Sequence, residues 1–184
     1  HVLCEKPIAS NEGEAARMAE AARETGCALV EAFHWRYHPL ATRMQAILAS
    51  GAIGAPRHYE AWFAIPLVMR GDIRWRLGLA GGALMDTGCY PISMVRHLAG
   101  AEPEVVSAKA LLRAPGVDRR VEAELRFADG RTAKIGCSMW SSSCRGRRWW
   151  PRCSSRRSSV PASSATSRRC STRWSPPAKW CGWA

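Results

Sequence analysis

Acidic residues are missing from the last quarter of this chain: residues 139–184 contain no aspartate or glutamate but ten lysines and arginines. Residues 1–138 hold all 15 acidic residues beside 17 basic ones, so this part carries almost no net charge. The formal charge of +12 therefore belongs to one segment and does not describe the surface of a folded domain. A basic pI alone does not assign the chain to the nucleic-acid-binding proteins.

The segment 141–184 also lacks apolar periodicity of either the helical or the strand kind. It combines Ser, Arg, Pro, Cys and Trp, and six of the nine tryptophans lie at or after Trp140. Basic residues among tryptophans can hold phosphates and stack on bases, so a nucleic-acid-binding protein stays open as an alternative. The composition is more typical of translation in a shifted frame. We expect a disordered, basic, out-of-frame tail from about residue 141, and nucleic acid is not the expected partner.

The eight cysteines include no Cys-x-x-Cys pair, so the spacing of a zinc or dithiol site is absent. No apolar run reaches the length of a membrane-spanning helix. His34 and His38 are four residues apart, but no acidic residue directly beside them completes a metal site. We therefore expect no metal, no membrane partner and a reducing compartment, which is the cytoplasm.

Residues 1–35 show the pattern of a strand, a helix and a second strand. Asn11 followed by Glu14 is typical of a capping box, and alanines and a methionine recur at helical spacing until Gly26. Residues 27–30 are continuously apolar, as in a parallel sheet covered on both faces. This order indicates the last part of a doubly wound, nucleotide-binding α/β domain.

Residues 36–140 predict an α+β domain with a mainly antiparallel open sheet packed on helices. The expected elements are a helix over 39–50, a strand over 57–64, a helix over 83–98 and strands over 105–112, 121–127 and 133–139. The helix over 39–50 should turn Leu40 toward the core. The alternation in the strand over 105–112 predicts that Val106 faces the core as well.

The stretch Gly81-Gly82 opens the helical run that places Asp86 and Tyr90 four residues apart, on one face of a helix. A neighbouring carboxylate and phenol can carry out proton transfer. Pro91 removes one backbone hydrogen bond from the same run and should kink the helix beside the pair. On spacing alone, the commoner roles are a turn or capping residue for Asp86 and a half-buried aromatic for Tyr90.

Three motifs follow one another along residues 1 to about 140: Glu5-Lys6-Pro7 after the first strand, Trp35-Arg36 after the second, and the stretch from Gly81 to Tyr90. In this order they resemble the Gfo/Idh/MocA family of nicotinamide-dependent oxidoreductases, which includes glucose-fructose oxidoreductase, inositol dehydrogenase and dihydrodiol dehydrogenase. The resemblance implies a remnant of a Rossmann nucleotide-binding domain in 1–35. It also implies an incomplete substrate and oligomerisation domain in 36–140, followed by the low-complexity tail in 141–184.

The same resemblance implies hydride transfer between NAD or NADP and a hydroxyl of a sugar, polyol or diol. It assigns catalytic roles to Lys6, Asp86 and Tyr90. Tyr90 would be the acid or base, Lys6 would lower the pKa of its phenol, and Asp86 would position Lys6 or the substrate. The residues that it implies for cofactor binding are Glu5, Lys6, Pro7, Trp35 and Arg36.

Two departures from the family pattern matter. Tyr90 replaces a histidine, as in the dihydrodiol, xylose and glucose-fructose enzymes, and Ser93 stands where the inositol enzymes often have aspartate, so inositol is disfavoured. The chain also has no Gly-x-Gly-x-x-Gly turn, so we expect an N-terminally truncated, inactive chain. A homo-oligomer through the sheet face is expected when the protein is intact. The alternative is a non-enzymatic remnant that only oligomerises or binds a partner.

Overall fold

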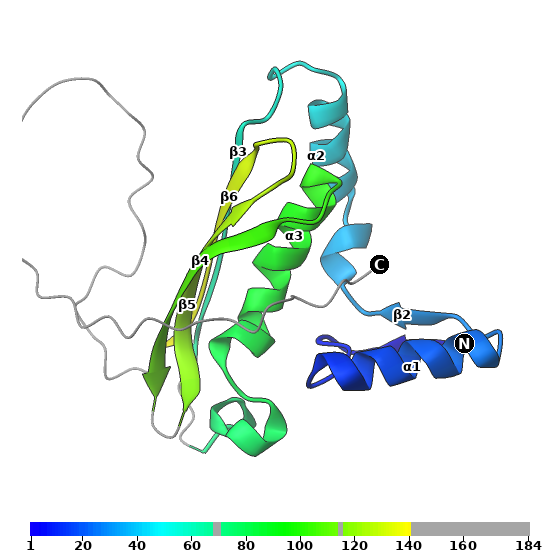
Figure 1. Ribbon diagram of the computed structural model, residues 1–184, viewed down its shortest axis with the longest axis vertical. Coiled ribbons are helices and arrows are strands. Elements are labelled where there is room, and N and C mark those ends of the chain that lie inside the picture. Colours follow the sequence, from blue (N-terminus) through cyan, green and yellow to red (C-terminus); the bar gives the residue numbers. More distant parts are fainter. Residues whose placement is uncertain (68–70, 114–115, 141–184) are drawn as a thin grey trace, which may run out of the picture.

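A computed structural model describes residues 1–67, 71–113 and 116–140. They form a small β-α-β unit and a four-stranded sheet with helices along one face (Figure 1). The expected change of frame and the disordered tail from residue 141 lie outside the described residues. Within the described part, no helix combines the length and apolar character needed to cross a membrane.

The β-α-β unit consists of β1 (Val2–Cys4), α1 (Glu12–Glu24) and β2 (Leu29–Glu31), and its two strands pair in parallel. The Asn11 side chain accepts a hydrogen bond from the Glu14 amide at 3.0 Å, as the capping pattern predicts. The Glu14 carboxylate accepts from the Ser10 amide at 3.0 Å. The box therefore closes one residue earlier than its usual form.

The remaining elements surround the second sheet, whose strand order is β3-β6-β5-β4. Strands β4, β5 and β6 pair antiparallel as predicted, whereas β3 joins β6 in parallel, so the sheet is mixed. The strands are β3 (His58–Pro66), β4 (Glu104–Arg113), β5 (Val117–Arg126) and β6 (Thr132–Trp140). The helices are η1 (His34–Tyr37), α2 (Pro39–Ala49), η2 (Ile73–Trp75), η3 (Leu77–Leu79), η4 (Leu84–Gly88) and α3 (Cys89–Ala99).

Helix α3 lies along one face of this sheet, and α2 lies beside α3 (Figure 1). Val95 of α3 is 1% exposed and belongs to the same core cluster as Leu125 and Ile135. Burying such a side chain contributes roughly 1.5–3 kcal/mol. The predicted core faces of β5 and β6 are confirmed, since Val121, Ala123, Leu125, Phe127, Ala133, Ile135, Cys137 and Met139 are all buried.

Core positions are predicted wrongly at Val106 and Leu112 of β4, the latter 53% exposed, and at Leu40 of α2. The pairing of β4 with β5 shifts register between Val105 and Ser107, and this irregularity turns Val106 outward, where it is 50% exposed. Leu40 is 60% exposed, because α2 turns its neighbour Ala41 inward instead. Apolar periodicity located both elements, but the register shift in β4 and the packing of α2 decided which residues became buried.

Candidate active site

Two glycines bring the chain into the helical run that carries the site. Gly82 has φ +138°, and a Cβ there would lie 2.1 Å from an oxygen of the Asp118 carboxylate. That carboxylate, from β5, accepts a hydrogen bond from the Leu84 amide at 2.7 Å. A Cβ on Gly81 would lie 2.6 Å from the carbonyl oxygen of Arg74. Only glycine fits at either position, so the pair lets the helix begin against both a strand and a loop.

The site run is not the single α-helix that its spacing predicts. Residues Leu84–Gly88 form a π-helix, and the Cys89 amide donates to the Leu84 carbonyl five residues earlier. The α-helix begins at Cys89, so Pro91 stands in its first turn, where proline is tolerated. The expected local conflict at Pro91 is thus relieved by a change of helical register just before it. Such π segments often occur at functional sites.

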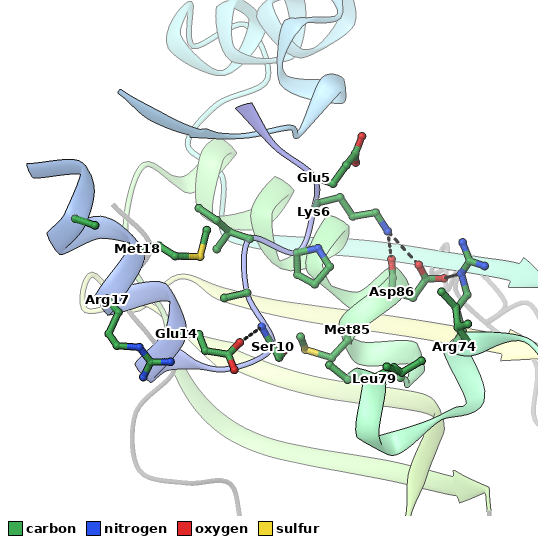
Figure 2. A pocket seen from close by; sticks show the side chains of 17 residues that line it. Glu5, Lys6, Ser10, Glu14, Arg17, Met18, Arg74, Leu79, Met85 and Asp86 are labelled. Atoms are coloured by element: carbon green, nitrogen blue, oxygen red, sulfur yellow. Dashed lines mark hydrogen bonds and ion pairs between the residues drawn. The ribbon is translucent and has the colours of Figure 1, made fainter. Parts of the chain in front are cut away.

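Lys6 reaches this π-helix from the end of β1 (Figure 2). Its Nζ donates to the backbone carbonyl of Asp86 at 2.6 Å and to the Asp86 Oδ1 at 3.1 Å. Both side chains are only 17% exposed. The structure therefore brings together two residues that are 80 positions apart and that the sequence assigned to one site.

The second oxygen of the Asp86 carboxylate is held by Arg74. The Arg74 Nε donates to Asp86 Oδ2 at 2.9 Å, and its Nη1 lies 3.3 Å from the Asp72 carboxylate. Asp86 thus lies between two cations, which makes its rotamer well determined. The expected role of Asp86, to position Lys6 or the substrate, stays a prediction.

Tyr90 completes the cluster, with the Lys6 Nζ 4.8 Å from the centre of its ring. This is a cation–π contact with the ring face. The ring also meets Phe33, Phe63 and His34 edge-on, with centroids 5.7, 5.0 and 6.1 Å away. Tyr90 is therefore fixed by side chains from the end of β2, from η1 and from β3.

The pKa of the Tyr90 phenol is raised above its ordinary value, which corrects the expectation that it falls. Burial raises the pKa most, the Lys6 ammonium lowers it, and Cys89 and Asp86 raise it further. The effect of Lys6 has the predicted direction, but removing the phenol from water outweighs it. The Tyr90 phenol consequently stays neutral over the physiological range.

A cleft of about 860 Å³ opens beside this cluster, between α1 and the residues that lead into the π-helix (Figure 2). Its lining includes Glu5, Lys6, Pro7, Arg74 and Asp86. The cleft lies beyond the carboxyl end of β1, the edge at which open α/β sheets bind ligands. Three of the five residues predicted for cofactor binding therefore meet at one cavity.

The other two predicted cofactor residues, Trp35 and Arg36, are not part of the lining of this cleft. Trp35 packs edge-on against His97 at 5.3 Å, and its buried indole Nε1 has no acceptor in the described part of the chain. Arg36 helps to lower the pKa of His97, which burial lowers first. Their assignment to the cofactor stays a prediction.

Of the cysteines near the site, Cys137 is buried and Cys89 is partly buried. Burial raises the pKa of Cys89 to about 11 and that of Cys137 to about 12. A thiol with such a pKa is a poor nucleophile at neutral pH. No group of three or more possible metal ligands occurs among residues 1–67, 71–113 and 116–140.

Sequence reasoning missed the part played by two residues. Asp118 stands in a strand with no motif around it, and only the fold shows that it accepts from the first amide of the π-helix. A basic residue in a loop such as that of Arg74 is commonly part of a solvated rim, whereas Arg74 holds the Asp86 carboxylate. The one signal in the sequence for this contact is that Arg74 lies in the loop that leads into the Gly81-Gly82 turn.

Comparison with known proteins identifies the family of this chain. The sequence pattern of the GFO/IDH/MocA C-terminal domain matches residues 41–154. The chain is 37% identical to a D-xylose 1-dehydrogenase (NADP+) of Haloferax volcanii, over 75% of this chain and 42% of the relative. It is 33% identical to a trans-1,2-dihydrobenzene-1,2-diol dehydrogenase of Xenopus laevis, over 77% of this chain and 43% of the relative.

The solved structures include a 3-ketoreductase of Actinomadura kijaniata in complex with NADP and TDP-benzene. It superposes with a TM-score of 0.71 at 37% identity, over 76% of this chain and 43% of that one. The chain thus spans about two fifths of the length of these relatives. With its residues 41–154 matched by the domain pattern, the chain belongs to the Gfo/Idh/MocA family.

Proposed function

We propose that this chain is part of an NAD(P)-dependent oxidoreductase that transfers a hydride between the nicotinamide ring and a sugar, polyol or diol carbon bearing a hydroxyl. The meeting of Lys6, Asp86 and Tyr90 carries the proposal, because three separate elements deliver an amine, a carboxylate and a phenol to one place. The relatives named as dehydrogenases and reductases support the reaction class.

The cleft fits the nicotinamide end of the cofactor. Its volume of about 860 Å³ lies in the usual range for small-molecule sites, and Glu5, Lys6 and Pro7 line it at the end of a parallel strand. These three residues would hold the nicotinamide, which when bound supplies or accepts the hydride. NADP is favoured over NAD because the Haloferax relative is named for NADP and the Actinomadura structure contains it.

Tyr90, Lys6 and Asp86 would each have a different role in the proton transfer. In the direction of carbonyl reduction, the neutral phenol of Tyr90 donates its proton to the substrate oxygen, and the raised pKa keeps that proton available. The Lys6 ammonium stabilises the developing negative charge on the same oxygen. Asp86 fixes Lys6 through two oxygens, its backbone carbonyl and Oδ1.

Variants of the Actinomadura reductase support these assignments. Solved structures of that enzyme include a lysine-to-alanine variant and a tyrosine-to-phenylalanine variant. The two substituted positions are separated by the same number of residues as Lys6 and Tyr90 in this chain. This equal spacing is consistent with Lys6 and Tyr90 taking the corresponding places.

The wider setting is part of the same proposal. The parallel β1 and β2, joined through α1, would be the end of a Rossmann domain. When the protein is intact, a face of the large sheet would meet a second copy. Four described cysteines are free, including the exposed Cys27, which suits the cytoplasm.

A chimera tests the function, with residues 1–140 of this chain replacing the matching segment of the Actinomadura reductase. We expect NADPH-dependent reduction of keto-sugars or aldoses. The measurement is the decrease in the absorbance of NADPH. The variant Lys6→Met should lower turnover by roughly 10²–10⁴-fold, since it removes the charge beside the reacting oxygen. A chimera that folds and binds NADPH but reduces no carbonyl in such a panel would contradict the proposal.

A further inference from the structure

The turn that follows β1 carries Lys6 into the site, but its backbone makes few contacts of its own (Figure 2). Within the described part of the chain, no hydrogen bond between two backbone groups involves residues 6–9. Pro7 adds no donor, because proline has no amide hydrogen. Holding a turn in one conformation costs entropy, so side chains have to fix this one if Lys6 is to stay in one place.

Glu31, the last residue of β2, makes such a contact. Its Oε1 accepts a hydrogen bond from the amide of Ile8, two residues after Lys6, at 2.9 Å. Among the residues that the structure describes, no other amide of residues 6–9 donates to a side chain. Glu31 is itself fixed by the sheet, where it pairs with Cys4. The bond therefore ties the far end of the turn back to the pair of strands from which the turn departs.

The Glu31 carboxylate lies where this turn meets the helices of the site. Glu31 is partly buried, and burial raises its pKa most, while the Ile8 amide and the charges of Arg96 and Arg36 lower it. Its charge also helps to raise the pKa of Cys89, the first residue of α3. The carboxylate is thus within electrostatic reach of η1 and α3 as well as bonded to the turn.

We propose that Glu31 is a positioning residue for Lys6: by accepting from the Ile8 amide, it holds the turn so that the Lys6 ammonium stays in the site. A carboxylate suits this task, since a hydrogen bond to a charged group is stronger than one between neutral groups. The importance of this placement for turnover rests on the function proposed above. The placement itself does not, because it can be measured without cofactor or substrate.

Two rival arrangements give the bond to Ile8 no such role. In the first, the charge of Glu31 matters only as a partner for Arg36 and Arg96. In the second, the turn is held by the Cys4 thiol, whose Sγ lies 3.7 Å from the Ile8 carbonyl oxygen. A thiol is a weak donor. The first rival requires the charge of Glu31 but not its reach, and the second requires neither.

The experiment follows the acetylation of Lys6 in the folded 184-residue chain. A limiting amount of an acetylating ester is added, and mass spectrometry of peptides gives the rate at Lys6 relative to the exposed Lys109 in the same molecule. Glu31→Leu removes the acceptor and keeps a side chain of similar size, so the turn should open more often. Loss of one hydrogen bond to a charged acceptor should raise the relative rate at Lys6 by about three- to tenfold.

Two conservative variants test the bond itself. Glu31→Gln keeps an oxygen at the same reach, so the relative rate at Lys6 should stay near that of the wild type. Glu31→Asp keeps the charge but is one methylene shorter, so it should release the Ile8 amide and raise the rate as Glu31→Leu does. If Glu31→Leu does not fold, Glu31→Asp carries the test.

Three results would overturn the proposal. A wild-type rate in Glu31→Asp would show that the charge alone suffices, and a wild-type rate in folded Glu31→Leu would show that the bond is not needed. A rate in Glu31→Gln as high as that in Glu31→Leu would show that an acceptor oxygen does not hold the turn.

Thr25→Ala is the matched control. The Thr25 hydroxyl donates to the Ala21 carbonyl at 2.7 Å at the C-terminal end of α1, so this variant removes a hydrogen bond from the same β-α-β unit, away from the Lys6 turn. The relative rate at Lys6 should stay unchanged. An equal rise in Thr25→Ala would mean that Lys6 reports only a general loosening of the unit, and the proposal would fail. None of these measurements depends on hydride transfer, so failure here and failure of the proposed function are distinguishable.

Discussion

Gly82→Ala is expected to destabilise the turn at the entrance to the site. The backbone at Gly82 has φ +138°, a region that L residues rarely adopt, and this strain costs about 1–3 kcal/mol. The added Cβ would lie 2.1 Å from the Asp118 carboxylate, which must then move away from the Leu84 amide. Loss of that capping bond costs about 1 kcal/mol more. We expect a total loss of roughly 2–4 kcal/mol in the free energy of unfolding.

Urea denaturation followed by far-UV circular dichroism measures this loss. Gly100→Ala is the matched control, because Gly100 has φ +65° but nothing within 4 Å of its added Cβ. In Gly100→Ala the free energy of unfolding should fall only by the cost of placing an alanine in the left-handed region, about 1–2 kcal/mol. The double variant Gly82→Ala with Asp118→Ala removes the steric conflict, so its loss should be smaller than the sum of the single losses by about 0.5–3 kcal/mol. This account of Gly82 would be refuted if Gly82→Ala and Gly100→Ala lost the same free energy of unfolding. It would also be refuted if the loss in the double variant equalled the sum of the losses in Gly82→Ala and Asp118→Ala.

Other predictions concern the same residues. Asp118→Asn should cost less stability than Asp118→Ala, because an amide oxygen still accepts from Leu84 without burying a charge. Burial raises the pKa of Asp118, so wild-type stability should decline as pH rises from about 3.9 toward that raised pKa, and Asp118→Asn should remove this slope in urea titrations. The raised pKa of Tyr90 has the same sign: stability should fall as pH rises above about 10, and the difference in tyrosinate absorbance between wild type and Tyr90→Phe should appear above that pH. A Tyr90 phenol that ionises below about 10 would contradict this.

The parts of the fold that sequence predicted are those set by local pattern. Alternation in residues 121–127 and 133–139 gave the core faces of β5 and β6, since a strand with one buried face imposes a period of two. The turn between them also follows from local chemistry, with Gly130 at φ +86° and the Asp129 carboxylate accepting from the Arg131 amide. The parallel pairing of β3 with β6 joins strands far apart in the chain, and no local pattern specifies it.

The candidate site was also predicted only in part. Lys6, Asp86 and Tyr90 were named from family resemblance, and the structure brings all three together. The direction of the Tyr90 pKa was predicted wrongly, because it depends on how far Phe33 and Phe63 remove the phenol from water. The π register could not be predicted either, since apolar spacing does not distinguish a local change of hydrogen-bond partner.

The pH dependence of carbonyl reduction by Tyr90→Phe tests the proposed chemistry most directly. In the chimera that carries residues 1–140, wild-type turnover should fall as pH rises through the raised pKa of Tyr90, because the proton to be donated is lost. Tyr90→Phe keeps the ring contacts with Lys6 and Phe63, so NADPH binding should stay the same while turnover drops by roughly 10²–10⁴-fold and the step in the pH profile disappears. Near-full turnover with an unaltered pH profile in Tyr90→Phe would show that Tyr90 only packs and that the proton comes from another group.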